Sequence, residues 1–184
     1  AIKTAKIAKG NPWTIMVLFC IITAVLSAFL DNVTTVLLVG PVTFTVCKML
    51  KMTPVPYFIV EIMASNIGGT ATLIGDPPNI MIGMQAGLTM LDFIVYNGPA
   101  IVMIMVAAIA MFYVLYGKNM SATSDEMESI MHLHAHEAIT DKGLFHKSVA
   151  MTIIVALAFV FHSVIGVEPS VVALTAAAIM LIIS

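Results

Sequence analysis

The chain has 184 residues, of which 60% are hydrophobic and only 10% are charged, and its formal net charge is −2. Soluble domains carry roughly 25% charged residues, so this composition predicts an integral membrane protein and excludes a soluble globular domain. All eight basic residues are lysines, and they form no cluster that could bind nucleic acid.

The first predicted unit is a helical hairpin over residues 13–49. An apolar run at 13–30 is interrupted by Asp31 and Asn32 and resumes over 33–47. Each arm is about as long as, or shorter than, the ~17–25 residues of a spanning helix. Lysines flank both outer ends, which places both ends in the cytoplasm by the positive-inside rule. The polar tip then lies at the far interface or, if the hairpin is re-entrant, inside the membrane.

The second predicted unit is a broken helix over residues 55–87. Residues 65–79 read SNIGGTATLIGDPPN and interrupt apolar sequence on both sides. Adjacent glycines, a carboxylate and two prolines cannot continue an ordinary helix. Irregular backbone at membrane depth is tolerated only where it is buried in protein or lines a cavity. We therefore predict that this break forms a binding site.

The remaining sequence predicts further spanning helices and one loop. Residues 99–116 are apolar and uncharged, and a capping box at 89–92 predicts a short interfacial helix before them. Residues 117–147 form an acidic, histidine-containing loop that we place in the cytoplasm. Two more helices are expected over 148–184. Residues 1–116 would carry the transport site of an all-α, multi-pass protein of the inner or plasma membrane.

The ends of the sequence predict a longer protein. The chain begins without Met and stops inside an apolar run. Many transporters consist of two repeats with the site at the repeat interface. We therefore expect about one half of an inverted-repeat transporter, whose partners are the missing second half and the lipid bilayer.

Asp31 is the main candidate residue at the hairpin tip. A carboxylate between two apolar arms costs at least ~2.5 kcal/mol in a membrane and commonly marks an ion pathway or proton relay. The alternative is an ordinary Asp-Asn turn in water. Asn32, Thr34 and Thr35 add side-chain oxygens, which are hard ligands suited to Na⁺ or Li⁺.

Asp76 is the main candidate residue at the helix break. The two prolines after it have no amide donor, so carbonyl groups around them are freer to face an ion. A break also exposes the ends of two half-helices, which attract ions, and glycines let the backbone approach a ligand closely. A polar surface loop is the alternative. The predicted ion-binding residues of the break are Ser65, Asn66, Gly68, Gly69, Thr70, Gly75, Asp76 and Asn79.

Glu61 and a pair of histidines are further candidate functional residues. Glu61, in the first half of the broken helix, is either a proton carrier or an interfacial residue, and it joins Asp31 and Asp76 as a candidate for proton coupling. His132 and His136 are four residues apart in the acidic loop. A solvated segment is the preferred interpretation there, so we predict neither a transition-metal site nor a cofactor.

Residues 27–36 (SAFLDNVTTV) and residues 65–79 together resemble two motifs of the arsenite permease and NhaD-type sodium–proton antiporter family. That family belongs to the ion transporter superfamily, with citrate-transporter-like proteins and the P protein. The resemblance implies a re-entrant hairpin with Asp31, Asn32 and Thr34 near its tip, facing an unwound break at 68–79. It also implies a homodimer and an elevator-like shift. Dicarboxylate carriers of the superfamily have Ser where Asp31 stands, which favours cation chemistry.

The predicted function is secondary transport that exchanges Na⁺ or Li⁺ for H⁺, without enzymatic activity. Protonation of Asp31 or Asp76 would compete with cation binding. One alternative is Na⁺- or H⁺-coupled transport of an oxyanion, a carboxylate or arsenite. A remote alternative is an intramembrane aspartyl protease that uses both aspartates, although LIGD at 73–76 lacks the first glycine of that motif. A purely structural membrane subunit would not need two polar breaks.

Overall fold

The computed structural model describes residues 6–125, 127, 142–160 and 169–183. Within these ranges every regular element is helical, as the composition predicts. The chain forms two compact units. The larger comprises Ala1–Leu88 and Asp92–Leu133, and the smaller comprises His134–Ser184 together with Thr89–Leu91.

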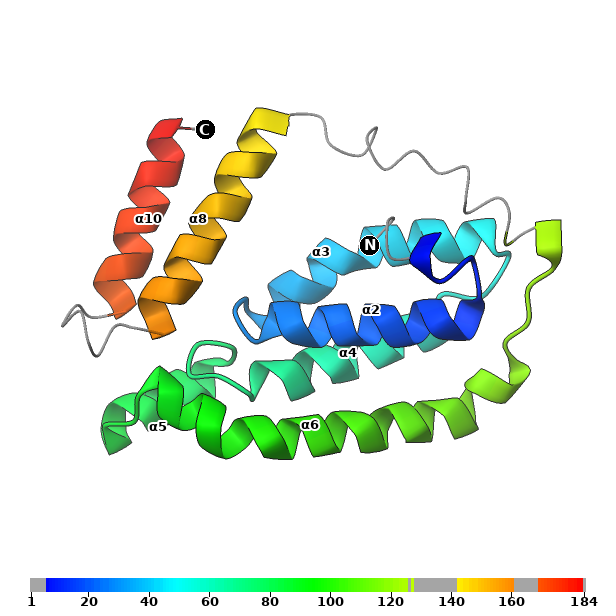
Figure 1. Cartoon of the computed structure of the whole chain (residues 1–184), viewed down its shortest axis with the longest axis horizontal. Helices are drawn as coiled ribbons and strands as arrows, with labels where there is room; N and C mark the ends of the chain where they lie inside the picture. The colour runs from blue at the N-terminus through cyan, green and yellow to red at the C-terminus, as the bar shows by residue number, and fades with distance from the viewer. Residues whose placement is uncertain (1–5, 126, 128–141, 161–168, 184) are drawn as a thin grey trace. The chain divides into compact units, whose positions relative to one another are not determined.

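Among the described residues, the larger unit contains five α-helices of ten residues or more (Figure 1). They are α2 (Pro12–Ser27), α3 (Asn32–Met49), α4 (Val55–Gly69), α5 (Pro77–Ala86) and α6 (Met90–Leu115). Helices α2 and α3 form a hairpin, and α4 packs against both, most extensively against α2. The turn of the hairpin separates α2 from α3, and residues 70–76 interrupt the helical course between α4 and α5.

Local sequence explains where α2 and α3 begin. Asn11 caps α2, because its Oδ1 accepts a hydrogen bond from the Thr14 amide at 3.0 Å. Asp31 caps α3 in the same way, and its Oδ2 accepts from the Thr34 amide at 3.0 Å. Such caps satisfy amide groups that have no partner within their own helix. The polar tip predicted after the first arm is therefore the start of α3.

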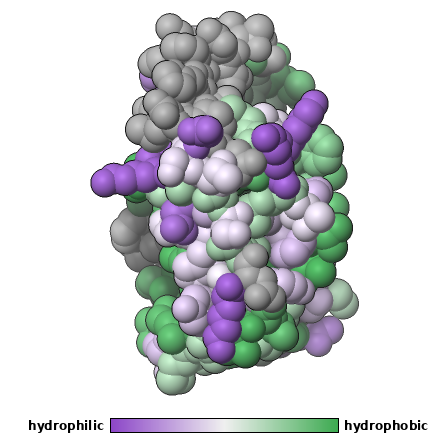
Figure 2. Space-filling model, turned by 90° about the vertical axis from the view of Figure 1, so that its right-hand side faces the viewer, coloured by the Kyte–Doolittle hydropathy of each residue, from purple (hydrophilic) through white to green (hydrophobic). Residues whose placement is uncertain are grey.

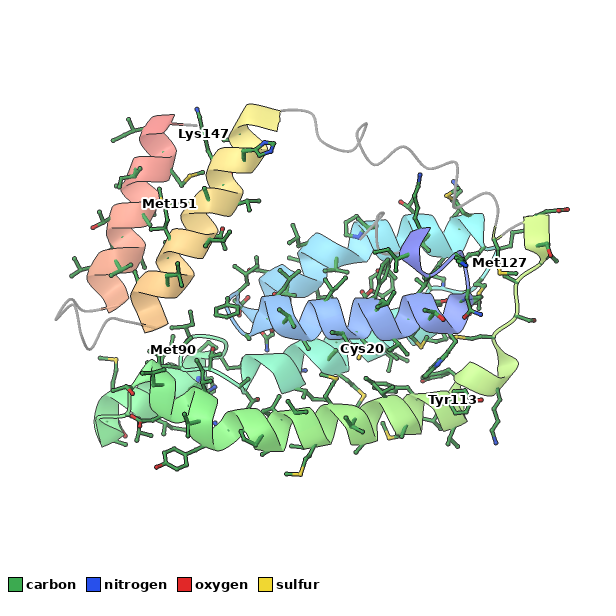
Figure 3. The ribbon with its side chains drawn as sticks, viewed as in Figure 1. Cys20, Met90, Tyr113, Met127, Lys147 and Met151 are labelled. Atoms are coloured by element: carbon green, nitrogen blue, oxygen red, sulfur yellow. The ribbon has the colours of Figure 1, made fainter. Side chains whose placement is uncertain are left out.

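The core of the larger unit lies where α2, α3 and α4 meet α6. The Trp13 and Tyr113 rings pack edge to face with their centroids 5.1 Å apart, which ties the start of α2 to the end of α6. Cys20 Sγ lies 3.6 Å from Met105 Sδ, and its side chain points from α2 into this core (Figure 3). Other buried core residues are Ile15, Met16, Phe19, Val46, Cys47, Leu50, Tyr57, Val60, Ala64, Ala108 and Phe112.

Apolar side chains also cover the outside of this unit. On α6, Val102, Met103 and Val106 are each more than 60% exposed. Two described helices, Asn32–Met49 and Met90–Leu115, are long and apolar enough to cross a membrane. An apolar surface of this kind suits contact with lipid better than contact with water.

Hydrophilic side chains gather at one end of the larger unit. Figure 2 looks onto the end at which α2 and α4 begin and α3 and α6 finish, and it shows hydrophilic residues among apolar ones. Lys9, Lys48 and Lys118 are exposed near these helix ends. Their position fits the lysine-rich flanks expected of spanning helices on the cytoplasmic side.

Helix α6 differs from the expectation of a short interfacial helix followed by a separate spanning helix. It runs for 26 residues from Met90 to Leu115 and contains Pro99. A proline inside a membrane helix is tolerated where neighbouring groups and local adjustment satisfy the freed carbonyl. The capping sequence at 89–92 therefore begins α6 itself.

The described part of the smaller unit contains α8 (Lys142–Val160) and α10 (Pro169–Ile183), which pack against each other (Figure 1). Apolar side chains, among them Ile154 and Val172, line a shallow pocket between these helices. The histidine tract at 132–136 lies outside the described residues.

Candidate ion-binding site

The hairpin turn lies against the break between α4 and α5. The Thr72 hydroxyl, in the break, donates to the Ala28 carbonyl oxygen, in the turn. Gly68 approaches α2 so closely that an added Cβ would come 2.1 Å from the Ala24 carbonyl oxygen. The two polar motifs, distant in sequence, are therefore neighbours in space.

Asn32 joins the two motifs directly. Its Nδ2 donates to Asn66 Oδ1 at 2.9 Å and to Asp76 Oδ1 at 3.0 Å. Its own Oδ1 accepts from the Val33 amide at 2.8 Å. Three predicted site residues, from the starts of α3 and α5 and the end of α4, thus form one polar group, which we call the Asn32 cluster (Asn32, Asn66 and Asp76).

The carboxylate of Asp76 is available to this cluster because of the two prolines that follow it. Asp76 is the N-cap of α5, yet its side chain makes no capping hydrogen bond. A capping side chain normally accepts from the second or third amide of the helix. Pro78 has no amide hydrogen at the second position, and the Asn79 amide donates to the Asp76 backbone carbonyl at 3.0 Å. The carboxylate therefore reaches across to Asn32.

Asp31 occupies the edge of the same region. Its Oδ2 accepts from the amide of Thr34 at 3.0 Å and from the hydroxyl of Thr34 at 3.2 Å. Its side chain is exposed on the larger unit, and it is near enough to Asp76 for the two carboxyl groups to interact electrostatically. In these bonds each carboxylate uses one oxygen, so the second oxygen of each can serve a ligand.

Asn79 organises the break from within. Its Nδ2 donates to the carbonyl oxygens of Thr72, Gly69 and Thr70 at 2.8, 3.3 and 3.4 Å. The Gly75 amide donates to the Thr72 hydroxyl at 3.1 Å, and an added Cβ at Gly75 would meet the Gly69 carbonyl oxygen at 2.3 Å. Asn79, which the sequence predicts to bind an ion, thus donates hydrogen bonds to buried backbone carbonyl groups of the break.

Three hydroxyl side chains that were predicted to bind an ion, those of Thr35, Ser65 and Thr70, do not contact the Asn32 cluster directly. The hydroxyls of Ser65 and Thr70 each donate at 2.9 Å to a carbonyl of their own helix, those of Ile62 and Asn66. Thr35 is fully buried behind the cluster. The structure therefore brings the amide and carboxylate candidates together, while these three hydroxyls stay outside the direct contacts of the cluster.

An apolar pocket of about 270 Å³ adjoins the cluster. Asn32, Ser65 and Asn66 form its polar side. The remaining lining residues are Val33, Val36, Leu37 and Ile62. A cavity with a few polar groups on an apolar wall is the usual form of a small-molecule site.

Sequence reasoning missed three residues that contribute here. Thr72 ties the break to the hairpin, Asn97 of α6 donates to the Thr70 carbonyl oxygen at 3.3 Å, and Thr43 of α3 donates to Glu61. The sequence feature that could have indicated Asn97 is its polar amide side chain within an apolar run. Thr43 gave no signal, because its partner depends on how α3 packs against α4.

The charge of the site is negative. Neither motif contains a lysine, and the chain has no arginine, so Asp31 and Asp76 supply the only full charges of the two motifs. Helix N-termini favour anions, but here a carboxylate already occupies the N-terminus of both α3 and α5. The arrangement therefore attracts cations and repels an unaccompanied anion.

Comparison with known proteins identifies a family for the whole chain. The model of the CitMHS family, described as citrate transporter, matches residues 1–184. A protein named as an uncharacterized transporter in Mycobacterium tuberculosis is 44% identical over all 184 residues, and a 46 kDa membrane protein of Mycobacterium leprae is 40% identical over the same length. The human P protein is 50% identical over 82 residues, which is 45% of this chain and 10% of that protein.

These relatives are longer than the chain. The chain spans 43% of the length of each of the two mycobacterial proteins. No solved structure matches the chain.

Proposed function

The chain belongs to the CitMHS citrate transporter family, a family of membrane transporters, and from this premise we propose that its full-length parent is a cation-coupled secondary transporter. The transported or coupling cation binds at the Asn32 cluster. One observation carries this proposal: the Asp76 carboxylate is released from capping its own helix and is held by Asn32 instead. No basic residue of the two motifs neutralises it.

The Asn32 amide provides a way for the cluster to accept a cation. Its NH₂ group now lies between Asn66 Oδ1 and Asp76 Oδ1. Rotation of the amide would replace this donor with an oxygen, so that three oxygens face one point. Amide and carboxylate oxygens are hard ligands, which suit Na⁺ or Li⁺ better than a soft metal ion. The second carboxylate oxygen of Asp31 would add negative charge at the edge of the Asn32 cluster.

Exchange of Na⁺ or Li⁺ against H⁺ follows from the same residues. A proton on Asp76 removes the charge that attracts the cation, so proton and cation compete for one site. Asp31 adds a second carboxylate within electrostatic range. Competition of this kind couples the two fluxes in opposite directions. We also expect the parent to be a multi-pass inner- or plasma-membrane protein, a homodimer, and an elevator-type carrier.

Cation-coupled transport of a carboxylate is the second candidate. The family description, citrate transporter, favours it, and the pocket beside the cluster offers room for a small organic molecule. Two aspartates would repel a free polycarboxylate, so such a substrate would have to enter together with the cation. Arsenite has less support, since Cys20 and Cys47 are buried in the apolar core.

Transport by the full-length parent in proteoliposomes with an imposed pH gradient tests both candidates. Na⁺, Li⁺, K⁺ and labelled citrate are added in turn while internal pH and uptake are followed. Dissipation of the gradient by Na⁺ or Li⁺ alone indicates exchange, whereas citrate uptake that requires a cation indicates cotransport. Asp76→Asn is expected to lower cation affinity roughly tenfold or more, because it removes a charge that attracts the cation by about 4 kcal/mol at a separation of about 4 Å and an effective dielectric constant of about 20.

Asp125→Asn is the matched control, since Asp125 is exposed and lies outside both motifs. It should behave as wild type. Unchanged cation dependence in Asp76→Asn would contradict the assignment of the site. Movement of citrate without any cation requirement would contradict cation coupling.

A further inference from the structure

We propose that Glu61 binds a proton inside the larger unit and exchanges it with the Asn32 cluster along buried hydroxyl groups of α2 and α3. This inference rests on the proposed function, since it identifies where a coupled proton is held. It assigns a role to polar groups that lie behind the cluster and do not contact it.

Glu61 is buried in the middle of α4. Only 1% of its surface is exposed, and it lies among apolar residues that include Tyr57, Val60 and Ala64 of its own helix. Its Oε1 accepts a hydrogen bond from the Thr43 hydroxyl of α3, while its Oε2 has no partner among the described groups. A charged carboxylate with a bare oxygen in such surroundings costs several kcal/mol, and such groups become neutral instead.

The hydrogen-bonding groups around Thr43 accommodate a neutral Glu61. The Thr43 hydroxyl has one hydrogen but lies near two acceptors, Glu61 Oε1 and the Val39 carbonyl oxygen at 3.4 Å. If Glu61 is protonated, its hydroxyl donates to Thr43 and Thr43 donates to Val39. This order gives every hydrogen an acceptor, and the remaining Glu61 oxygen is neutral. Hydroxyls act as donors and acceptors at once, so the heavy-atom positions fit it.

Within the part of the chain that the structure describes, the other groups that face Glu61 provide no counter-ion. The titratable neighbours are the thiols of Cys20 on α2 and Cys47 on α3. Tyr57, one turn away on α4, is also titratable, and its hydroxyl donates to the Pro12 carbonyl oxygen at 2.9 Å. From α6, Met105, Ala108 and Phe112 contribute apolar side chains to the same core. A thiol is only a weak hydrogen-bond donor and cannot carry a positive charge, so neither cysteine can act as a counter-ion to an ionised Glu61.

Further buried hydroxyls lie on α2 and α3, the two helices that pack against α4. Thr23 and Ser27 lie one turn apart on α2, Thr35 and Thr43 lie two turns apart on α3, and all four are fully buried. The side-chain oxygens of Thr23, Ser27 and Thr35 have no hydrogen-bond partner among the described groups. Buried polar groups without partners are rare, and buried water commonly serves them. Thr35 is three residues from Asn32, so this series ends beside the cluster.

The proposed transfer involves one proton and no change of oxidation state. The O–H bond of Glu61 breaks, the proton passes along hydroxyls and water, and an O–H bond forms at Asp76. Loss of the cation from the cluster makes Asp76 a better proton acceptor, and cation binding reverses the transfer. Glu61 would then hold the proton while the cation occupies the cluster.

Infrared spectroscopy and transport assays on the reconstituted full-length parent test this proposal. At neutral pH the wild type should show a carbonyl-stretch band of a protonated carboxylic acid, and Glu61→Gln should remove it. Glu61→Gln should also lower proton-driven transport at least tenfold. Because the proton displaced from Asp76 would then leave the protein, the variant should steepen the pH dependence of cation affinity. A residue with only a structural role would not change that pH dependence.

Thr43→Val provides a second variant in case Glu61→Gln does not fold. Loss of its hydroxyl should shift the frequency of the same band and the pH profile of transport. Thr45→Val is its matched control, because the Thr45 hydroxyl is exposed and donates to the Pro41 carbonyl of its own helix; it should change neither.

Three outcomes separate the proposal from the function on which it rests. A band that persists in Glu61→Gln would overturn protonation of Glu61. Proton-driven transport of wild-type rate in that variant would overturn the relay. A wild-type protein that moves cations or citrate without protons would overturn the coupling, even if the band disappears in Glu61→Gln.

Discussion

Three carboxylates of the larger unit have different neighbours, and these neighbours determine what each can do. Asp31 caps α3 through Thr34. Asp76 stands at the equivalent position of α5 but is deprived of a capping partner by the prolines that follow, so it binds Asn32. Glu61 lies in the core with one hydroxyl partner. The same functional group thus serves as a helix cap in Asp31, as a hydrogen-bond partner between the two motifs in Asp76 and as a buried polar group in Glu61.

Asn79 allows a sharp test at the scale of a single residue. Asn79→Asp replaces the amide donor by a carboxylate oxygen beside three carbonyl oxygens, so repulsion should replace attraction. We expect the variant to lose about 1–3 kcal/mol of stability, the cost of leaving buried polar groups unpaired, and most of its transport. Thermal denaturation and uptake assays measure both.

Asn11→Asp is the matched control for this substitution. The Asn11 side chain acts as an acceptor, since its Oδ1 binds the amide and the hydroxyl of Thr14. Aspartate caps a helix as well as asparagine does, so this variant should keep wild-type stability. Equal effects of the two substitutions would show that the donor role of Asn79 is irrelevant.

At the scale of elements, the lengths of α2 and α4 explain how polar backbone groups come to lie within an apolar unit. α2 has 16 residues and α4 has 15, so each is about 22–24 Å long at 1.5 Å per residue and shorter than the ~30 Å hydrocarbon core. Their C-terminal ends meet the N-terminal ends of α3 and α5. The freed backbone groups of the break are satisfied by Asn79 and Thr72, which leaves the carboxylates for a ligand.

The contact between α2 and α4 depends on Gly68. An alanine there would place its Cβ 2.1 Å from the Ala24 carbonyl oxygen, and a backbone atom cannot move aside as a flexible side chain can. Gly68→Ala should therefore force α2 and α4 apart, at a cost of about 1–3 kcal/mol, and displace the hairpin turn from the break. Thermal denaturation of the full-length parent and its cation affinity report the two effects.

Gly98→Ala serves as the control within α6. A Cβ at Gly98 would meet no atom within 4 Å, and alanine favours a helix over glycine by roughly 0.5–1 kcal/mol. This variant should match or slightly exceed wild-type stability. A comparable loss in both variants would mean that close packing of α2 on α4 is not what Gly68 provides.

At the scale of the whole molecule, the exposed apolar surface and the hydrophilic end of the larger unit indicate how it sits in a bilayer. The 26 residues of α6 extend for about 39 Å, which is enough to cross the hydrocarbon core. Exposed lysines lie near the ends of α3 and α6. These features support a cytoplasmic position for that end.

Site-specific cysteine labelling tests this orientation. Cysteines introduced at Lys48 and Lys118 should react with a membrane-impermeant maleimide from the cytoplasmic side. A cysteine at Gln85, exposed near the start of α6, should react from the opposite side. The native thiols are buried and should give little background. Labelling of all three positions from one side would contradict a spanning α6.

The amino-acid sequence by itself determined the class of the protein, the helical segments and the two places where they are interrupted. These properties depend on composition and on local chemistry: apolar runs form helices in lipid, and glycine, proline and a cap residue end them. The family motifs at 27–36 and 65–79 were recognisable for the same reason. The continuation of α6 through Pro99 was not recognisable from the sequence, because a helix tolerates an internal proline only where its surroundings satisfy the freed carbonyl group.

Only the tertiary structure decided which polar groups meet. The partnership of Asn32 with Asn66 and Asp76, and that of Thr43 with Glu61, join residues from different helices. Such contacts depend on the register of α3 against α4, which side-chain packing sets and no local pattern encodes. Asn79 was predicted to bind an ion, but its side-chain amide donates to a carbonyl group of the break. Buried backbone carbonyl groups need hydrogen-bond donors, and Asn79 supplies one.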